Sequence, residues 1–221
     1  MAAFRRAVEQ GAEFIETDLH LTRDARFVAI HDTTLDRTTN GHGAVRDMTL
    51  AQLRELDAGK WFDREFMDER IPTLEEILEF AKERDVVFYL ELKYDSAWGM
   101  HHALVGALRG VEYASRTLVI SFDPAQIEAV RRLDRGIMTG LLVETVDGDA
   151  VKAAIGIGAR QLCPRADMVT PELVQCAHEK DLLVATWTVD QLEEMRRVID
   201  AGVDGVMSNF PDRLRGVVSS L

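Results

Sequence analysis

Residues 14–20 read Phe14-Ile15-Glu16-Thr17-Asp18-Leu19-His20. Alternate side chains of an extended strand point to the same face, so Glu16, Asp18 and His20 would share one face of a strand here. Two neighbouring carboxylates repel each other unless a cation lies between them, and calcium and magnesium favour such hard oxygen ligands. The stretch therefore predicts a strand that carries part of a site for a divalent cation, Ca²⁺ or Mg²⁺.

Two further apolar runs also end in polar side chains. Residues 86–90 are followed by Glu91-Leu92-Lys93, in which Glu91 and Lys93 are two apart and would share a face. Residues 27–30 are followed by His31-Asp32. Three polar strand ends of this kind in one chain indicate an active site.

Strand-like and helix-like segments alternate from Thr73 to the C-terminus, and we expect the last strand at Val203–Ser208. The strands are almost continuously apolar, which is typical of a parallel sheet buried on both faces. The pattern predicts a TIM-type (β/α)₈ barrel, with an open doubly wound sheet as the alternative. Four expected helix starts support it: Thr73 with Glu76, Asp123-Pro124, Thr170-Pro171, and Asp190 with Glu193.

Length and composition predict one domain over residues 1–221, with residues 36–72 as an insertion in a βα loop. The formal net charge of -12 argues against a nucleic-acid partner. No segment reaches the roughly 20 apolar residues of a membrane span. Two cysteines without metal-type spacing and no visible signal peptide favour the cytoplasm. A homo-oligomer stays an open alternative.

With these motifs in view, the chain resembles the glycerophosphodiester phosphodiesterase family. The resemblance follows family order over almost the whole chain and rests on these stretches: Phe14 to Asp24, Val28 to Asp32, Leu35 to Gly41, Ile71 to Leu74, Glu91 to Lys93, Ser121-Phe122, Trp187 to Val189, and Gly202 to Pro211. The family has a (β/α)₈ barrel and hydrolyses glycerophosphodiesters to an alcohol and sn-glycerol 3-phosphate with a divalent cation. The resemblance thus implies a metal-dependent phosphodiesterase of glycerophospholipid metabolism.

The same resemblance assigns roles residue by residue. Its implied metal ligands are Glu16, Asp18 and Glu91. His31 matches one of the family's two catalytic histidines, and we expect it to act as general acid. Two residues match substrate-binding positions, namely Lys93, which would neutralise phosphate, and Trp187, which would line the glycerol pocket.

One departure concerns the N-terminus. Family members begin with a strand that ends in His-Arg-Gly, whereas this sequence opens on a segment that resembles the helix after that strand. We therefore expect a misplaced start, with the first strand, the first catalytic histidine and any signal peptide encoded upstream. Two alternatives stay open. One is a lysophospholipase D-type activity, with Trp61, Phe62 and Phe66 as apolar contacts; the other is a catalytically impaired, truncated barrel.

We expect two further residues of these motifs to have supporting roles. Arg37 would stabilise the root of the insertion, and His20 would orient a neighbouring group in the site.

Overall fold

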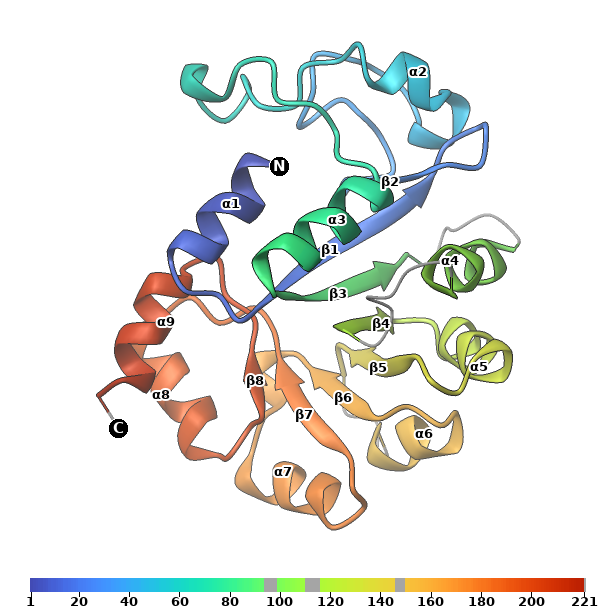
Figure 1. Ribbon diagram of the computed structural model, residues 1–221. Coiled ribbons are helices and arrows are strands. Elements are labelled where there is room, and N and C mark those ends of the chain that lie inside the picture. Colours follow the sequence, from blue (N-terminus) through green and yellow to red (C-terminus); the bar gives the residue numbers. More distant parts are fainter. Residues whose placement is uncertain (94–98, 110–115, 146–149, 221) are drawn as a thin grey trace. The chain divides into compact units, whose positions relative to one another are not determined.

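The computed structural model describes residues 1–93, 99–109, 116–145 and 150–220. The chain forms two compact units (Figure 1). The first contains Met1–Glu9 and Glu13–Arg116, and the second contains Gln10–Ala12 and Thr117–Leu221. Each unit is described by itself below.

The first unit is built on strand β1 (Phe14–Leu21). Strand β3 (Val87–Leu92) lies parallel to β1. Strand β2 (Phe27–Ala29) pairs antiparallel with the last three residues of β1. The antiparallel β2 differs from the all-parallel expectation, because the chain reverses through a tight turn at residues 22–26. The helices of this unit are α1 (Ala2–Glu9), α2 (Leu50–Leu53), α3 (Leu74–Arg84) and α4 (Met100–Arg109), with 3₁₀ turns at Val45–Asp47 and Arg64–Phe66.

Residues 36–72 form an irregular segment with an apolar core of its own. Val45, Leu53 and Ile71 are buried there against Val28 and Leu35. Apolar burial of this kind is what holds a long connection in one conformation.

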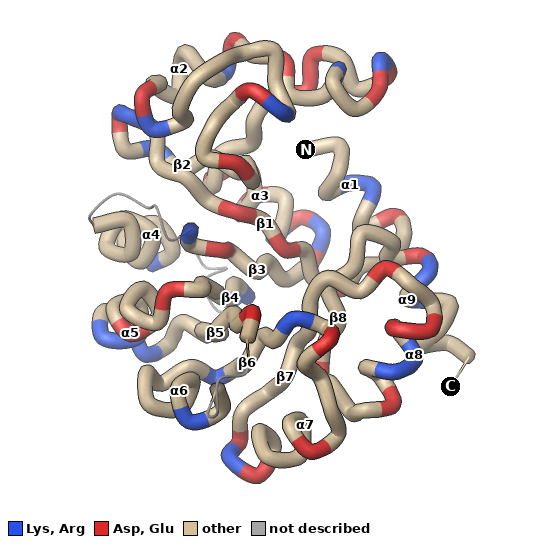
Figure 2. Tube along the Cα trace, turned by 180° about the vertical axis from the view of Figure 1, so that it is seen from behind, with Lys and Arg blue, Asp and Glu red and all other residues tan. Residues whose placement is uncertain are grey.

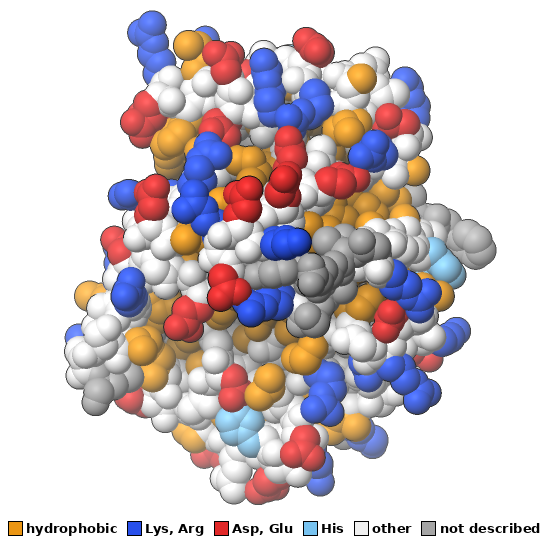
Figure 3. Space-filling model, in the orientation of Figure 1, with side chains coloured by type: hydrophobic (Ala, Val, Ile, Leu, Met, Phe, Trp, Pro, Cys, Tyr) orange, Lys and Arg blue, Asp and Glu red, His pale blue; other side chains and the backbone are white. Residues whose placement is uncertain are grey.

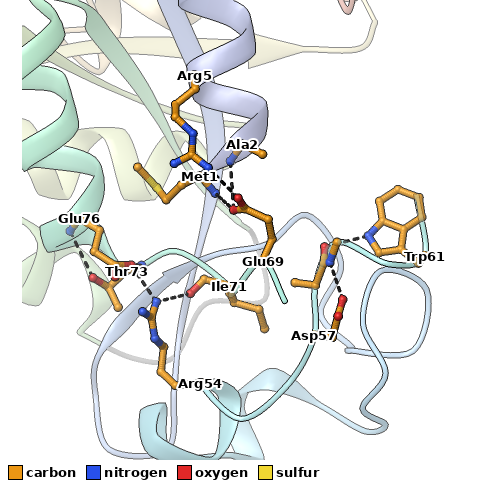
Figure 4. A network of polar contacts seen from close by, with 12 residues as sticks. Met1, Ala2, Arg5, Arg54, Asp57, Trp61, Glu69, Ile71, Thr73 and Glu76 are labelled. Atoms are coloured by element: carbon orange, nitrogen blue, oxygen red, sulfur yellow. Dashed lines mark hydrogen bonds and ion pairs between the residues drawn. The ribbon is translucent and has the colours of Figure 1, made fainter. Parts of the chain in front are cut away.

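Polar contacts tie the end of this segment to its neighbours, as Figure 4 shows. Glu69 accepts hydrogen bonds from the Ala2 amide (3.1 Å) and from Arg5 Nη2 (2.6 Å) of α1. Arg54 Nη1 donates to the Ile71 carbonyl (3.1 Å) and to Glu76 (2.9 Å). The segment is therefore anchored to both α1 and α3.

The second unit alternates strands and helices as the sequence predicts. Its parallel strands are β4 (Thr117–Ser121), β5 (Met138–Val143), β6 (Gln161–Pro164), β7 (Leu183–Thr186) and β8 (Gly205–Val206). Its helices are α5 (Pro124–Leu133), α6 (Ala150–Gly156), α7 (Pro171–His178), α8 (Leu192–Asp200) and α9 (Pro211–Val218), with a 3₁₀ turn at Ala166–Met168. Helices α5 to α8 follow the outer side of these strands (Figure 1), where Leu162, Val184 and Val198 belong to one buried core.

Three of the four expected helix starts are confirmed. Thr73 and Glu76 form a reciprocal capping box, and Asp123 and Thr170 cap α5 and α7. The fourth, Asp190, is wrong as a cap, because its carboxylate accepts from Ser208 Oγ (3.1 Å) and from the Asn209 amide (2.9 Å) instead. The expected strand Val203–Ser208 is also too long. Only Gly205–Val206 pairs as β8, and the Met207 amide continues to donate to Thr186.

None of the helices in the described residues has the length and apolar character needed to cross a membrane.

Candidate active site

Three carboxylates meet where β1 and β3 run side by side. The pairing register sets Asp18 directly opposite Glu91, and Glu16 lies two residues earlier on the same face of β1. Figure 2 shows acidic positions on both neighbouring strands. One carboxylate oxygen from each of Glu16, Asp18 and Glu91 lies within 4.8 Å of the other two. The structure thus brings together the three carboxylates that the sequence selected.

Lys93 adds a positive charge to this cluster. It follows β3, and its Nζ lies 2.5 Å from Asp18 Oδ1 and 2.9 Å from Glu91 Oε1. Burial lowers the pKa of Lys93, but the Asp18 and Glu91 carboxylates outweigh it and raise the pKa above its ordinary value. Lys93 therefore carries its charge at neutral pH, although one ammonium cannot balance three carboxylates.

Glu16 is the carboxylate that Lys93 leaves unbalanced. Burial, followed by repulsion from Asp18 and Glu91, raises its pKa from 4.5 to about 8. Burial likewise raises the pKa of Glu91. Glu16 Oε1 is buried and, within the described part of the chain, has no hydrogen-bond partner. A buried polar atom without a partner is costly, and a divalent cation would satisfy it. The donor set fits such an ion, because all three ligands are hard oxygens.

The backbone at His31 follows directly on a hydrogen bond to the strand that carries Asp18. The amide of Ile30, which precedes it, donates to the carbonyl of Asp18 (3.1 Å). His20 Nε2 lies 3.3 Å from the His31 carbonyl oxygen, so His20 contacts the His31 backbone. The His31 side chain is 67% exposed, and its Nδ1 lies 2.7 Å from Asp32 Oδ1. An exposed ring that a carboxylate holds on one side can offer its other nitrogen to a substrate.

Trp187 belongs to the second unit, where it follows β7. Its indole Nε1 donates to the Cys163 carbonyl (2.8 Å). Its ring meets the Phe122 ring edge to face at a centroid distance of 5.3 Å. The indole is therefore fixed within its own unit, and its role toward substrate stays a prediction.

Two groups of surface side chains bear on possible partners. Over the described residues of the face in Figure 3, acidic and basic side chains are interspersed. In the first unit, Trp61 and Phe62 are 50% and 70% exposed, with ring centroids 5.7 Å apart. Phe66 extends this aromatic group, with its centroid 5.8 Å from that of Phe62.

Sequence reasoning missed the contacts of Arg37. The guanidinium binds Asp32, which itself contacts His31. No regular periodicity signals this pair, because Asp32 and Arg37 are five residues apart in irregular backbone.

Comparisons with known proteins find relatives over almost the whole chain. Residues 1–213 match the glycerophosphoryl diester phosphodiesterase family. A glycerophosphodiester phosphodiesterase of Caldanaerobacter subterraneus subsp. tengcongensis is 37% identical over 220 residues, which cover 99% of this chain and 90% of that protein.

Solved structures show the same fold. A phosphodiesterase of Oleispira antarctica in complex with the product sn-glycerol-3-phosphate is 25% identical, with a TM-score of 0.88 over 99% of this chain and 90% of that one. A glycerophosphoryl diester phosphodiesterase structure from Silicibacter pomeroyi is 27% identical, with a TM-score of 0.86 over 98% and 86% of the two chains. The predicted α/β fold of the TIM-barrel class is thereby confirmed.

Proposed function

Because the chain belongs to the glycerophosphoryl diester phosphodiesterase family, we propose that it hydrolyses glycerophosphodiesters to an alcohol and sn-glycerol 3-phosphate with the help of a divalent cation. Family membership makes the protein a phosphodiester hydrolase. The observation that best supports the cation is the group of Glu16, Asp18 and Glu91, in which a buried oxygen of Glu16 has no hydrogen-bond partner in the described structure.

The three carboxylates would hold the ion, Ca²⁺ or Mg²⁺. When bound, such an ion polarises the phosphoryl oxygens and offsets the charge that develops on them. Lys93 supplies a second positive charge from the same strand end. These groups would bind and orient the phosphodiester.

His31 would donate a proton to the leaving alkoxide as general acid. Its exposed ring and its contact with Asp32 support this assignment. Trp187 would present its ring to the carbon face of glycerol, as aromatic rings do for apolar surfaces. Its fixed indole supports a role as a binding wall.

A direct assay tests the proposal. The purified chain would receive glycerophosphocholine with calcium or magnesium, and then with a chelator, while sn-glycerol 3-phosphate is measured. Release that the chelator abolishes is the expected result. Release that persists in chelator would contradict the metal dependence.

A separate assay tests the alternative of an impaired, truncated barrel. The chain would be assayed beside a version that restores any upstream in-frame segment encoding His-Arg-Gly. Activity in the extended form alone would support truncation. An in-frame upstream stop codon with no such segment would rule out a misplaced start.

A second candidate substrate class follows from the exposed rings of Trp61 and Phe62, against which Phe66 packs. Such a group suits an acyl chain, which favours lysophospholipase D-type activity. Phe62→Ser would then lower the rate on lysophosphatidylcholine and leave the rate on glycerophosphocholine unchanged. Equal effects on both substrates would exclude this role.

We also propose a cytoplasmic location. The substrates there would be the glycerophosphodiester headgroups of glycerophospholipids. Cys176 is an exposed free thiol and Cys163 a buried one, as is typical of a reducing compartment. Cell fractionation with an antibody against the protein would test this; recovery in an extracytoplasmic fraction would contradict it.

A further inference from the structure

Asp32 links His31 to Arg37 through both of its carboxylate oxygens. Oδ1 lies 2.7 Å from His31 Nδ1 and 2.8 Å from Arg37 Nη2. Oδ2 accepts from Arg37 Nε at 2.6 Å. Arg37 therefore binds the carboxylate through two parallel hydrogen bonds, which fix the plane of the carboxylate as well as its position.

This ion pair contributes little to stability. Arg37 is 55% exposed and Asp32 26% exposed, and exposed ion pairs stabilise a fold by at most about 1 kcal/mol. The backbone around Arg37 is held by other bonds: the Thr39 amide and Thr39 Oγ1 both donate to the carbonyl of the buried Leu35. The local backbone thus has supports other than the Arg37 side chain, whose hydrogen bonds go to Asp32.

The contact with Asp32 also sets the proton positions on the His31 ring. The guanidinium of Arg37, and then the imidazole of His31, hold the pKa of Asp32 well below its ordinary value. An ionised carboxylate only accepts hydrogen bonds, so Nδ1 of His31 must be the nitrogen that carries the hydrogen toward it. The other ring nitrogen, Nε2, is then left for the substrate.

We propose that Arg37 is a positioning residue for the reaction. Its guanidinium fixes the Asp32 carboxylate, which holds His31 Nδ1–H and leaves Nε2 as the atom that exchanges a proton with substrate. This inference rests on the proposed role of His31 as general acid. Arg37 itself touches neither substrate nor cation in this account.

The test compares Arg37→Met with a matched control. Arg26 is 48% exposed and binds Glu75 through one exposed ion pair at 2.7 Å in the same unit, so Arg26→Met removes a similar surface arginine. With glycerophosphocholine and saturating cation, Arg37→Met lowers kcat about 10- to 100-fold and leaves KM nearly unchanged, which is the usual size of such indirect effects. Arg26→Met retains normal values. An unchanged kcat, or a rise in KM alone, in Arg37→Met would overturn the proposal.

Chemical rescue supplies a second readout, which loss of packing alone would not give. Added guanidinium restores part of kcat to Arg37→Ala, because it can reproduce the two bonds to Asp32. Ammonium restores less, because it lacks the planar fork. Equal rescue by both ions, or none by either, would count against a positioning role.

A spectroscopic readout separates this proposal from the proposed function. ¹⁵N NMR of the histidine rings, with His31→Gln to assign its signals, reports which nitrogen of His31 carries the hydrogen. We expect a mixed pattern in Arg37→Met and Nδ1–H in the unaltered chain and in Arg26→Met. Identical ring spectra in all three would refute the inference. If instead His31→Gln keeps full activity, the general-acid role fails while the ring spectra still test the positioning.

Discussion

Asp18 and Glu91 lie directly opposite each other in the parallel pairing of β1 and β3, and Lys93 Nζ contacts both carboxylates. Paired positions of neighbouring strands hold like charges close together, which is unfavourable without a cation. Lys93 meets part of this need, and Glu16 retains a buried oxygen without a hydrogen-bond partner in the described structure. The close approach of these carboxylates is unfavourable in the absence of a cation. The same close approach places their oxygens where a divalent ion could bind them.

Removing a carboxylate should therefore abolish activity that the cation supports. In an active form of the protein, we expect Glu91→Ala and Glu16→Ala each to lower kcat/KM on glycerophosphocholine by about 10³-fold or more, since a metal supplies several kcal/mol of transition-state stabilisation. Glu179, exposed on the second unit, provides a matched control in Glu179→Ala. Near-normal rates for both site variants would refute the metal assignment.

The raised pKa of Glu16 predicts how stability depends on pH. Folding raises the pKa of Glu16 from 4.5 to about 8. Between these two pH values, Glu16 keeps a proton in the folded protein that it has already lost in the unfolded chain. The free energy of unfolding of the metal-free protein should thus fall as the pH rises from about 5 to about 8.

Urea unfolding of chelator-treated protein at several pH values measures this slope, with Glu16→Gln as the comparison. The amide cannot titrate, so the variant should lose less stability over the window. Equal slopes for the two proteins would show that Glu16 titrates at its ordinary pKa.

Loss of Lys93 should lower stability, because the repulsion among the carboxylates then lacks the positive charge that offsets it. In chelator, we expect Lys93→Met to lower the free energy of unfolding by about 1.5–3 kcal/mol, the usual value of hydrogen bonds to charged groups. Added calcium or magnesium should recover part of that loss. Lys180→Met alters an exposed lysine of the second unit and should have little effect. A Lys93→Met protein as stable as the unaltered chain would contradict this account of the cluster.

Asp190 is expected to stabilise the segment after β8. Its carboxylate accepts from Ser208 Oγ and from both the backbone amide and the side chain of Asn209. Asp190→Ala should cost about 1–3 kcal/mol in urea unfolding, because these donors lose their acceptor. Asp212→Ala, a change in the first turn of α9, is the control. A cost no larger than that of the control would mean that Asp190 has no such role.

The sequence was most informative where chemistry is local. The Thr73 box and the Asp123 and Thr170 caps depend on residues within one turn, and the spacing of Glu16 and Asp18 depends only on strand alternation. The meeting of these carboxylates with Glu91 follows from parallel pairing, which a barrel fold implies.

Contacts that depend on irregular backbone could not be predicted in the same way. Asp190 resembles a capping residue by spacing, but it lies within reach of Ser208 and Asn209 only once the chain has folded. The reversal that makes β2 antiparallel passes through a tight turn at residues 22–26, and Arg37 reaches Asp32 across irregular backbone, so neither follows a regular period of the sequence. Local propensity carries no signal for such pairs.

The central claim is that Glu16, Asp18 and Glu91 hold a divalent cation that supports phosphodiester hydrolysis. It is tested most directly by the initial rate of sn-glycerol 3-phosphate release from glycerophosphocholine as a function of free calcium or magnesium, in the unaltered protein and in Glu16→Gln. We predict a rate that saturates with the cation in the unaltered protein and that needs about tenfold more cation or more in the variant. A rate independent of the cation, or the same cation dependence in both proteins, would contradict the account.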